Sequence, residues 1–270
     1  MTIALQLDHV RKEFPAKSGE AFVAVDNISL NIQQGEFVSI VGPSGCGKST
    51  LLDLVAGLTK PSDGQILLNG KKITGPGLDR GIVFQQYALY RWLTALENIE
   101  FGLEAKGIAK KIRREKAQYY LNLVGLVGFE QHYPNELSGG MKQRVAIARS
   151  LAYEPEILLM DEPFAALDAQ TRETLQEELI NIWKTSGSTI IFITHSIDEA
   201  IYLSQRVAIL TSRPGRVKQI IQIPELLQAK GQDIRSTPEY GKIRHHIWTQ
   251  LSEEVIKAQA FEKNKQLQHA

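Results

Sequence analysis

The feature that most limits how this chain can fold is the run GPSGCGKS at positions 42–49, which fits the pattern G-x-x-x-x-G-K-S. The apolar run EFVSIV at 36–41 precedes it and predicts a buried strand, and LLDLVAGL follows with helical spacing. Between a strand and a helix, this pattern indicates a loop whose backbone N–H groups hold phosphates at a helix N-terminus. We therefore expect an α/β fold built around a phosphate site.

Each position of the loop has a physical reason for its residue type. Gly45 and Gly47 let the loop curl so that its amides face inward. Lys48 would reach the terminal phosphates, and the Ser49 hydroxyl would ligate Mg²⁺. The remaining predicted nucleotide contacts of the loop are Gly42, Pro43, Ser44, Cys46 and Thr50. The alternative is a glycine-rich turn without a ligand.

Cys46 is the chain's single cysteine, so no internal disulfide can form. This cysteine usage is typical of a reducing cytoplasm. Because Lys48 and a helix N-terminus lie nearby in the sequence, we expect a thiolate-prone, reactive thiol. The alternative is an inert, buried thiol.

A second motif supplies carboxylates. The run ILLMDEP at 157–163 predicts a buried strand that ends in Asp161 and Glu162. Ligands of α/β sheets bind at the carboxyl ends of the strands. Asp161 is therefore expected to hold the Mg²⁺ shell, and Glu162 to orient or deprotonate an attacking water. The alternative is that DEP merely ends the strand.

The rest of the chain alternates apolar strands with helices. Strands are predicted at 3–14 and 22–32, a helix-rich segment at 94–133, an amphipathic helix at 138–153 and a hairpin at 206–223. This alternation favours a mostly parallel sheet. From about Pro224 a polar tail is expected, with one short amphipathic helix marked by Ile243, Ile247, Leu251 and Val255.

Composition narrows the possible functions. Apolar residues make up 43% and charged residues 23% of the chain, as in ordinary globular proteins. No uncharged stretch is long enough to span a bilayer. The net charge of +1 argues against a general nucleic-acid binder.

LSGGMKQR at 137–144, shortly before ILLMDEP, is the signature that distinguishes ATP-binding cassette proteins from other phosphate-loop enzymes, and the chain resembles that family. The resemblance covers roughly 3–215. It implies a phosphate-loop NTPase (RecA-like) core with a mostly parallel sheet, an N-terminal antiparallel β subdomain and an inserted helical subdomain at about 90–153. It also implies an ATPase domain at 3–235, followed by a C-terminal helical tail at 236–270.

The resemblance also assigns roles to single residues. Phe14 matches the aromatic that stacks on adenine, Gln85 the glutamine that touches the metal and the attacking water, and His195 the histidine that contacts the γ-phosphate. Asp168 belongs to the D-loop motif Ala166-Leu167-Asp168. Phe14 could instead be a core residue and His195 a structural histidine.

In this family two cassettes close head to tail around two ATP molecules. Ser138, Gly139 and Gly140 would face the γ-phosphate held by the other subunit, where glycines and a helix N-terminus suit an anion. The alternative for Ser138 is a simple helix N-cap. One chain carries one signature and one phosphate loop, so a working ATP and Mg²⁺ site requires a second cassette subunit, identical or homologous.

Four less specific motifs indicate one branch of the family. FAALDAQTRETLQEEL, ITHSIDEAIYLSQRVAIL, TSRPGRV and PEYGKIRHHIW are similar to the importer ATPases for nitrate, sulfonates and taurine, with bicarbonate relatives. That resemblance implies separate permease subunits, an external substrate-binding protein and a peripheral place on the cytoplasmic face of the cell membrane, with no nucleic acid. The alternatives are a soluble cassette ATPase acting on nucleic acid or ribosomes, and the ATPase of another transporter class.

The segment from Gln85 to Asn98 lies where the family docks a helix of the membrane subunit. We expect it to form part of a groove, with Tyr87, Leu89, Trp92 and Leu93 as its apolar members. One departure is that the group usually has proline before the tryptophan, where this chain has Arg91. The alternative is that these side chains pack internally.

Overall fold

The computed structural model describes residues 2–15, 21–228 and 234–268. It divides the chain into two compact units, one formed by Met1–Pro76 with Ile191–Ala270 and the other by Gly77–Ile190. Positions 16–20 and 229–233 of the predicted ATPase domain, and 269–270 of the predicted tail, lie outside the described residues. Among the residues that are described, no helix has both the length and the apolar character needed to cross a membrane.

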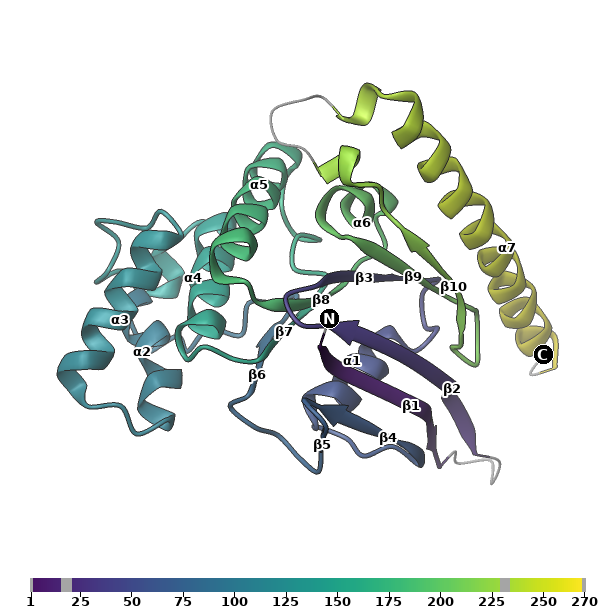
Figure 1. Cartoon of the computed structure of the whole chain (residues 1–270), viewed down its shortest axis with the longest axis horizontal. Coiled ribbons are helices and arrows are strands. Elements are labelled where there is room, and N and C mark those ends of the chain that lie inside the picture. Colours follow the sequence, from purple (N-terminus) through teal and green to yellow (C-terminus); the bar gives the residue numbers. More distant parts are fainter. Residues whose placement is uncertain (1, 16–20, 229–233, 269–270) are drawn as a thin grey trace. The chain divides into compact units, whose positions relative to one another are not determined.

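The first unit contains an antiparallel sheet in the strand order β2-β1-β4-β5 (Figure 1). Its strands are β1 (Ile3–Phe14), β2 (Phe22–Gln33), β4 (Asp63–Leu68) and β5 (Lys71–Lys72). Leu5, Leu7 and Val10 of β1 are buried, and Ile28, Leu30 and Ile32 of β2 face the same core. The predicted antiparallel N-terminal sheet is confirmed.

The same unit holds the strand that leads into the phosphate loop. β3 (Phe37–Val41) is buried throughout and pairs in parallel with β9 (Arg206–Leu210), which pairs antiparallel with β10 (Val217–Gln222). The helices α1 (Lys48–Ala56) and α6 (Ile197–Leu203) belong to this unit. β8 (Thr189–Ile193) carries the chain back into it from the second unit.

The second unit is built from two parallel strands and a group of helices. β6 (Arg80–Val83) pairs in parallel with β7 (Ile157–Asp161). Between these strands the chain forms α2 (Ala95–Ala105), α3 (Lys110–Leu123), the 3₁₀ turn η1 (Pro134–Glu136) and α4 (Gly139–Ala152). α2, α3 and α4 pack on one another through buried side chains such as Ile99, Leu121 and Val145 (Figure 1). α5 (Ala169–Ser186) follows β7.

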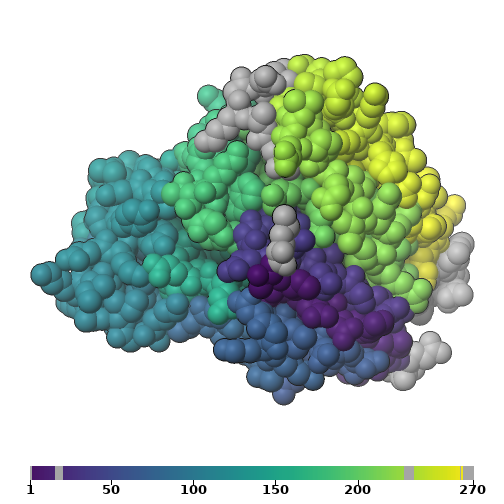
Figure 2. All heavy atoms as spheres, viewed as in Figure 1, coloured from purple at the N-terminus to yellow at the C-terminus, as the bar shows by residue number. Residues whose placement is uncertain are grey.

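The C-terminal segment differs from its prediction. After η2 (Glu225–Gln228) and η3 (Ile234–Ser236), α7 runs over Pro238–Gln268, 31 residues, so the expected short helix was wrong in length. The segment is not simply a polar tail either. Its buried side chains join Val41, Val207, Ile209 and Ile223 in one apolar cluster, and they are Leu227, Ile234, Tyr240 and Ile247. In Figure 2 the yellow residues of α7 lie directly against the light-green residues of the preceding segment and hairpin.

Candidate functional site

The predicted phosphate loop connects β3 to α1, as its sequence context implied. Gly45 and Gly47 have φ angles of 71° and 99°, in the left-handed region that favours glycine. Gly47 also lies so close to β2 that an added β-carbon would stand 2.7 Å from the carbonyl oxygen of Ala24. Any larger residue at Gly47 would therefore displace the loop from β2.

Lys48 is the first residue of α1, and its side chain is buried inside the loop. Its Nζ donates hydrogen bonds to the carbonyl oxygens of Gly42, at 2.8 Å, and Pro43, at 3.0 Å. Ser49 and Thr50 complete the first turn of α1, with Ser49 exposed. An ammonium group and the N-terminal amides of a helix thus lie together, which is a chemistry that fits phosphate.

The structure contradicts the expectation that Cys46 has a reactive, thiolate-prone side chain. Its side chain is 1% exposed. Burial raises the pKa of the Cys46 thiol, and the charges of Lys48 and Arg213 only partly oppose this. The prediction of a thiolate-prone Cys46 was wrong, because the sequence shows the neighbouring charge but not the burial.

Phe14 lies at the end of β1, where its ring is 38% exposed and Lys12 Nζ stands 5.0 Å above it. Its cross-strand partner is Phe22, which is similarly exposed. The guanidinium of Arg213 lies 5.2 Å from the Phe22 ring centre. Phe22 is thus a second exposed aromatic that the sequence analysis did not single out, since only strand pairing brings it beside Phe14.

His195 follows β8 and is exposed. The Thr194 amide donates to the carbonyl oxygen of Ile40 in β3, at 3.3 Å. The Thr194 hydroxyl donates to Glu199 in α6, at 2.5 Å. These bonds place the turn that carries His195 at the same edge as the start of the phosphate loop, which begins two residues after Ile40.

In the second unit, the register of β6 and β7 brings the polar candidates together. Val83 pairs with Met160. Gln85 lies two positions beyond Val83, and Asp161 and Glu162 lie one and two positions beyond Met160, so all three leave the same sheet edge. Glu162 has a φ of 44°, a backbone conformation that non-glycine residues rarely adopt and that often marks a functional position.

The signature segment begins α4. Ser138 is the N-cap, and its hydroxyl accepts a hydrogen bond from the Met141 amide at 3.3 Å, so its capping role is real. Ser138 and Gly139 are exposed, whereas Gly140 is buried against Thr171, with room for no β-carbon. The Tyr87 hydroxyl lies 3.3 Å from where a β-carbon of Gly139 would stand. The turn after Gln85 and the signature are therefore neighbours.

Asp168 caps α5. Its carboxylate accepts a hydrogen bond from the Thr171 amide at 3.0 Å. Hydrogen bonds from Thr171 lower the pKa of Asp168, so the cap remains ionised.

The predicted site residues thus form two groups. The first unit brings the loop at 42–50 together with the turn of His195, and the second brings Gln85 together with Asp161 and Glu162. Ser49, Gln85 and Asp161 offer hydroxyl, amide and carboxylate oxygens, which Mg²⁺ prefers as ligands. Within the described part of the chain there is no cluster of three or more His, Cys, Asp or Glu side chains that could hold a metal.

A loop of this geometry after a buried strand, with a second strand ending in two acids, defines a phosphate-loop ATPase. Comparison with known proteins gives the family. The family model described as "ABC transporter" matches residues 25–165. An uncharacterized ABC transporter ATP-binding protein of Methanocaldococcus jannaschii is 52% identical over 258 residues, 96% of this chain and 95% of the relative.

Two relatives carry more specific names. The nitrate import ATP-binding protein NrtD of Synechocystis sp. is 49% identical, over 90% of this chain and 93% of the relative. The taurine import ATP-binding protein TauB of Roseobacter denitrificans is 42% identical, over 93% of this chain and 96% of the relative. The dimeric ATP-binding cassette MJ0796, solved in a post-hydrolysis state bound to ADP and Pi, matches with a TM-score of 0.72 and 37% identity, covering 82% of this chain and 99% of that chain.

The chain belongs to the ABC transporter family, and it is an ATP-binding, ATP-hydrolysing subunit of that family. The predicted α/β phosphate-loop fold and the resemblance on which it rested are confirmed. Cassettes of this family form dimers, as both matched structures do.

Proposed function

We propose that the chain is the energy-coupling ATPase of an importer that takes up a small anion such as nitrate, a sulfonate or taurine through separate permease subunits. The observation that carries this proposal is its 49% identity to a nitrate import ATP-binding protein and 42% identity to a taurine import ATP-binding protein, over at least 90% of this chain. These relatives favour import over a cassette ATPase that acts on nucleic acid or ribosomes.

In this proposal residues 3–235 form the ATPase domain, with the helical subdomain at about 90–153, and 236–270 form the tail. The amides of the loop at 42–50 and the Lys48 ammonium bind the phosphates of ATP, and Phe14 stacks on adenine. Ser49, Gln85 and Asp161 hold Mg²⁺, which offsets phosphate charge when bound. Glu162 orients the attacking water and accepts its proton, and His195 contacts the γ-phosphate.

The signature and the D-loop act on the neighbouring subunit in the proposed dimer. Ser138 and Gly139 are exposed at the N-terminus of α4, so their amides can approach an anion held by a second cassette. Asp168 is exposed as well and would lie at the same contact. The partner cassette is a second copy or a homologous chain.

A cavity in the second unit supports the proposed contact with a permease. It measures about 550 Å³ and is lined by the turn after Gln85 and by the segment before the signature: Gln86, Tyr87, Leu89, Arg91, Pro134, Asn135 and Lys142. Trp92, beside it in sequence, is 73% exposed. The aromatic and basic lining suits an amphipathic helix of a membrane subunit.

The loop at 90–94 is held rigidly by one buried side chain. Asn98 Nδ2 donates to the carbonyl oxygens of Tyr90, Leu93 and Thr94, and its Oδ1 accepts from the Tyr90 amide. The Tyr90 ring packs 4.4 Å from that of Phe101. This internal packing leaves Arg91 and Trp92 exposed on a fixed loop, which is how binding loops are usually supported.

The proposal places the chain peripherally at the cytoplasmic face of the membrane, with an external binding protein delivering the substrate. The test is reconstitution of the chain with its permease in liposomes, followed by uptake assays with nitrate, taurine and other sulfonates. Uptake of one of these that requires ATP would support the proposal. Failure of the chain to co-purify with any permease would contradict it.

A further inference from the structure

α7 packs on the rest of the first unit, although the sequence presents it as a tail. Ile247 is fully buried, and the Tyr240 hydroxyl donates to Asp198 in α6 at 2.7 Å. Lys218 Nζ in β10 donates to the carbonyl oxygen of Gln250 at 2.9 Å. α7 therefore has a defined position beside the β9–β10 hairpin over its first half, up to Gln250.

Glu254 of α7 is a buried acid whose side chain reaches the turn of that hairpin. It is 1% exposed, and its carboxylate accepts hydrogen bonds from the Ser212 amide, at 3.0 Å, and the Ser212 hydroxyl, at 3.3 Å. Lys218 and Lys257 stand 3.1 and 2.7 Å from the same carboxylate. Burial alone would raise the pKa of Glu254, but these hydrogen bonds and charges outweigh it and lower the pKa to about 2.

The same turn touches the phosphate loop. Arg213 Nε donates to the carbonyl oxygen of Gly45 at 2.9 Å. Gly215 is so close to the loop that an added β-carbon would stand 2.1 Å from the carbonyl oxygen of Cys46. Gly215 also bonds to β2, where its amide donates to Ala24 and its carbonyl oxygen accepts from the Asp26 amide.

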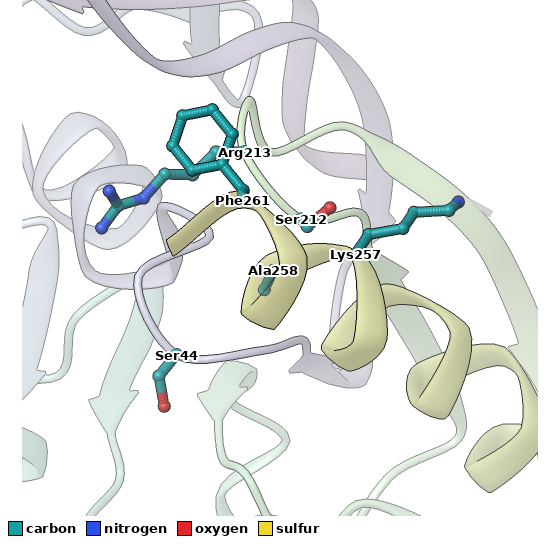
Figure 3. A pocket seen from close by; sticks show the side chains of 6 residues that line it. All are labelled: Ser44, Ser212, Arg213, Lys257, Ala258 and Phe261. Carbon is teal, nitrogen blue, oxygen red and sulfur yellow. The ribbon is translucent and has the colours of Figure 1, made fainter. Parts of the chain in front are cut away.

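A cavity supports this arrangement independently. It measures about 220 Å³ and is lined by side chains from all three segments: Ser44, Ser212, Arg213, Lys257, Ala258 and Phe261. Figure 3 shows the end of α7 beside the turn of Ser212 and Arg213, with the loop of Ser44 next to both. The Lys257 side chain points away from that loop in this view, and its Nζ donates to Glu254 at 2.7 Å.

We propose that Glu254 is a positioning residue for the phosphate loop: through Ser212 and Arg213, α7 holds Gly45 and Cys46 in the conformation that binds nucleotide. The proposal rests on the proposed phosphate-binding role of the loop. A buried carboxylate with two donors on one turn restricts that turn strongly, because releasing it would leave a charge unpaired. Loosening the loop should weaken binding of both ATP and ADP, whose phosphates it holds in the ground state.

Cys46 gives a readout that does not depend on hydrolysis. It is the chain's only cysteine, it lies inside the loop and it is buried. The rate at which the full chain reacts with a maleimide therefore reports how often the loop opens. We expect Glu254→Gln to raise this rate about tenfold and the Kd for ADP and ATP several-fold, with kcat at saturating ATP changed less than twofold.

The matched control is Glu253→Gln. Glu253 is the adjacent acid on α7 and pairs with Lys218, but it does not contact Ser212. Glu253→Gln should change neither the rate of maleimide labelling of Cys46 nor the Kd for nucleotide by more than about twofold. A second variant, Arg213→Gln, cuts the link between the turn and Gly45 while leaving the Glu254 contacts intact, and it should reproduce the faster labelling.

Ile66→Val, in the antiparallel sheet, controls for global stability, because it should lower stability without opening the loop. The proposal would be overturned if Glu254→Gln and Glu253→Gln were labelled at equal rates. It would also be overturned if Glu254→Gln were labelled faster than the wild type but bound nucleotide with unchanged affinity. The phosphate-binding role itself fails in a different way: the wild-type chain would then bind no ATP, and Mg-ATP would not slow its labelling.

Discussion

Arg149 of α4 donates a hydrogen bond to the carbonyl oxygen of Tyr87, at 2.9 Å, and thereby ties the signature helix to the turn after Gln85. A second nitrogen of the same guanidinium donates to the next carbonyl oxygen, that of Ala88, at 2.6 Å. Tyr87 and Ala88 have φ angles of 60° and 48°, which cost free energy in non-glycine residues. The guanidinium thus stabilises a backbone conformation that would otherwise relax.

Replacing Arg149 by Ala should lower the free energy of unfolding by about 2–3 kcal/mol, because two carbonyl oxygens lose a charged donor. The free energy of unfolding of Arg149→Lys should lie between those of the wild type and Arg149→Ala, because an ammonium lacks the planar fork that donates to two adjacent carbonyl oxygens. Urea unfolding of the three proteins measures this order. If Arg149→Ala were as stable as the wild type, the turn at Tyr87 and Ala88 would keep its conformation without the hydrogen bonds from Arg149.

Replacing Glu162 by Gln should preserve ATP binding and abolish most turnover. The amide cannot accept the proton of water, and removing a general base typically costs about 10²–10⁴-fold in rate. The variant should also accumulate as an ATP-bound dimer, measured by sedimentation with ATP. Glu177→Gln, an exposed acid on α5, is the control and should hydrolyse ATP normally. Near-normal turnover of Glu162→Gln would remove Glu162 from the catalytic role.

Replacing His195 by Ala should lower kcat strongly and leave KM for ATP nearly unchanged. A γ-phosphate contact that strengthens in the transition state affects kcat rather than ground-state binding. Steady-state hydrolysis with the exposed α7 variant His246→Ala as control gives the comparison. A large rise in KM with kcat intact would instead indicate simple ground-state binding.

Glu254 should make the free energy of unfolding depend on pH under acidic conditions. Its pKa is about 2 in the folded chain against an ordinary 4.5. The stabilisation is therefore complete above pH 4.5 and is lost as the pH falls from there towards 2. This shift corresponds to about 3 kcal/mol. The groups that face the carboxylate are Ser212, Lys218 and Lys257, and Lys218 also pairs with Glu253.

Urea unfolding of the wild type and Glu254→Gln at pH 7, 4 and 3 measures this dependence. The difference between the two proteins should be largest at pH 7 and shrink as the pH falls. Glu253→Gln, an exposed neighbour, should show no such trend. A difference that stays constant from pH 7 to 3 would show that Glu254 titrates normally.

Most of the fold could be predicted because it rests on local patterns. The phosphate loop, the buried strand before Asp161 and the Ser138 cap are each specified within a few neighbouring residues. The length of α7 could not be predicted, since its apolar positions are sparse and their partners, such as Val41 and Val207, lie far away in the sequence. Glu254 carries no motif at all, because its partner Ser212 is 42 positions away. The thiol of Cys46 was misjudged for the same reason: burial is a property of the folded chain.

Replacing Arg91 by Glu gives the most demanding test of the proposed permease contact. Arg91 is exposed, lines the 550 Å³ cavity and stands on the loop that Asn98 holds in place. Reversing its charge should disturb a docked helix without disturbing the chain's own fold. Hydrolysis by the isolated chain should therefore be unchanged, whereas substrate-stimulated hydrolysis of the complex in liposomes should fall at least severalfold.

Lys111→Glu, the same charge reversal at an exposed position of α3 that does not line the cavity, is the control and should leave both assays intact. If Arg91→Glu leaves both assays intact as well, this surface is not the site of coupling. If hydrolysis by the isolated chain collapses too, the segment serves the fold rather than a partner. These outcomes can be told apart because Arg91 is exposed between Tyr90, whose ring packs on Phe101, and the exposed Trp92.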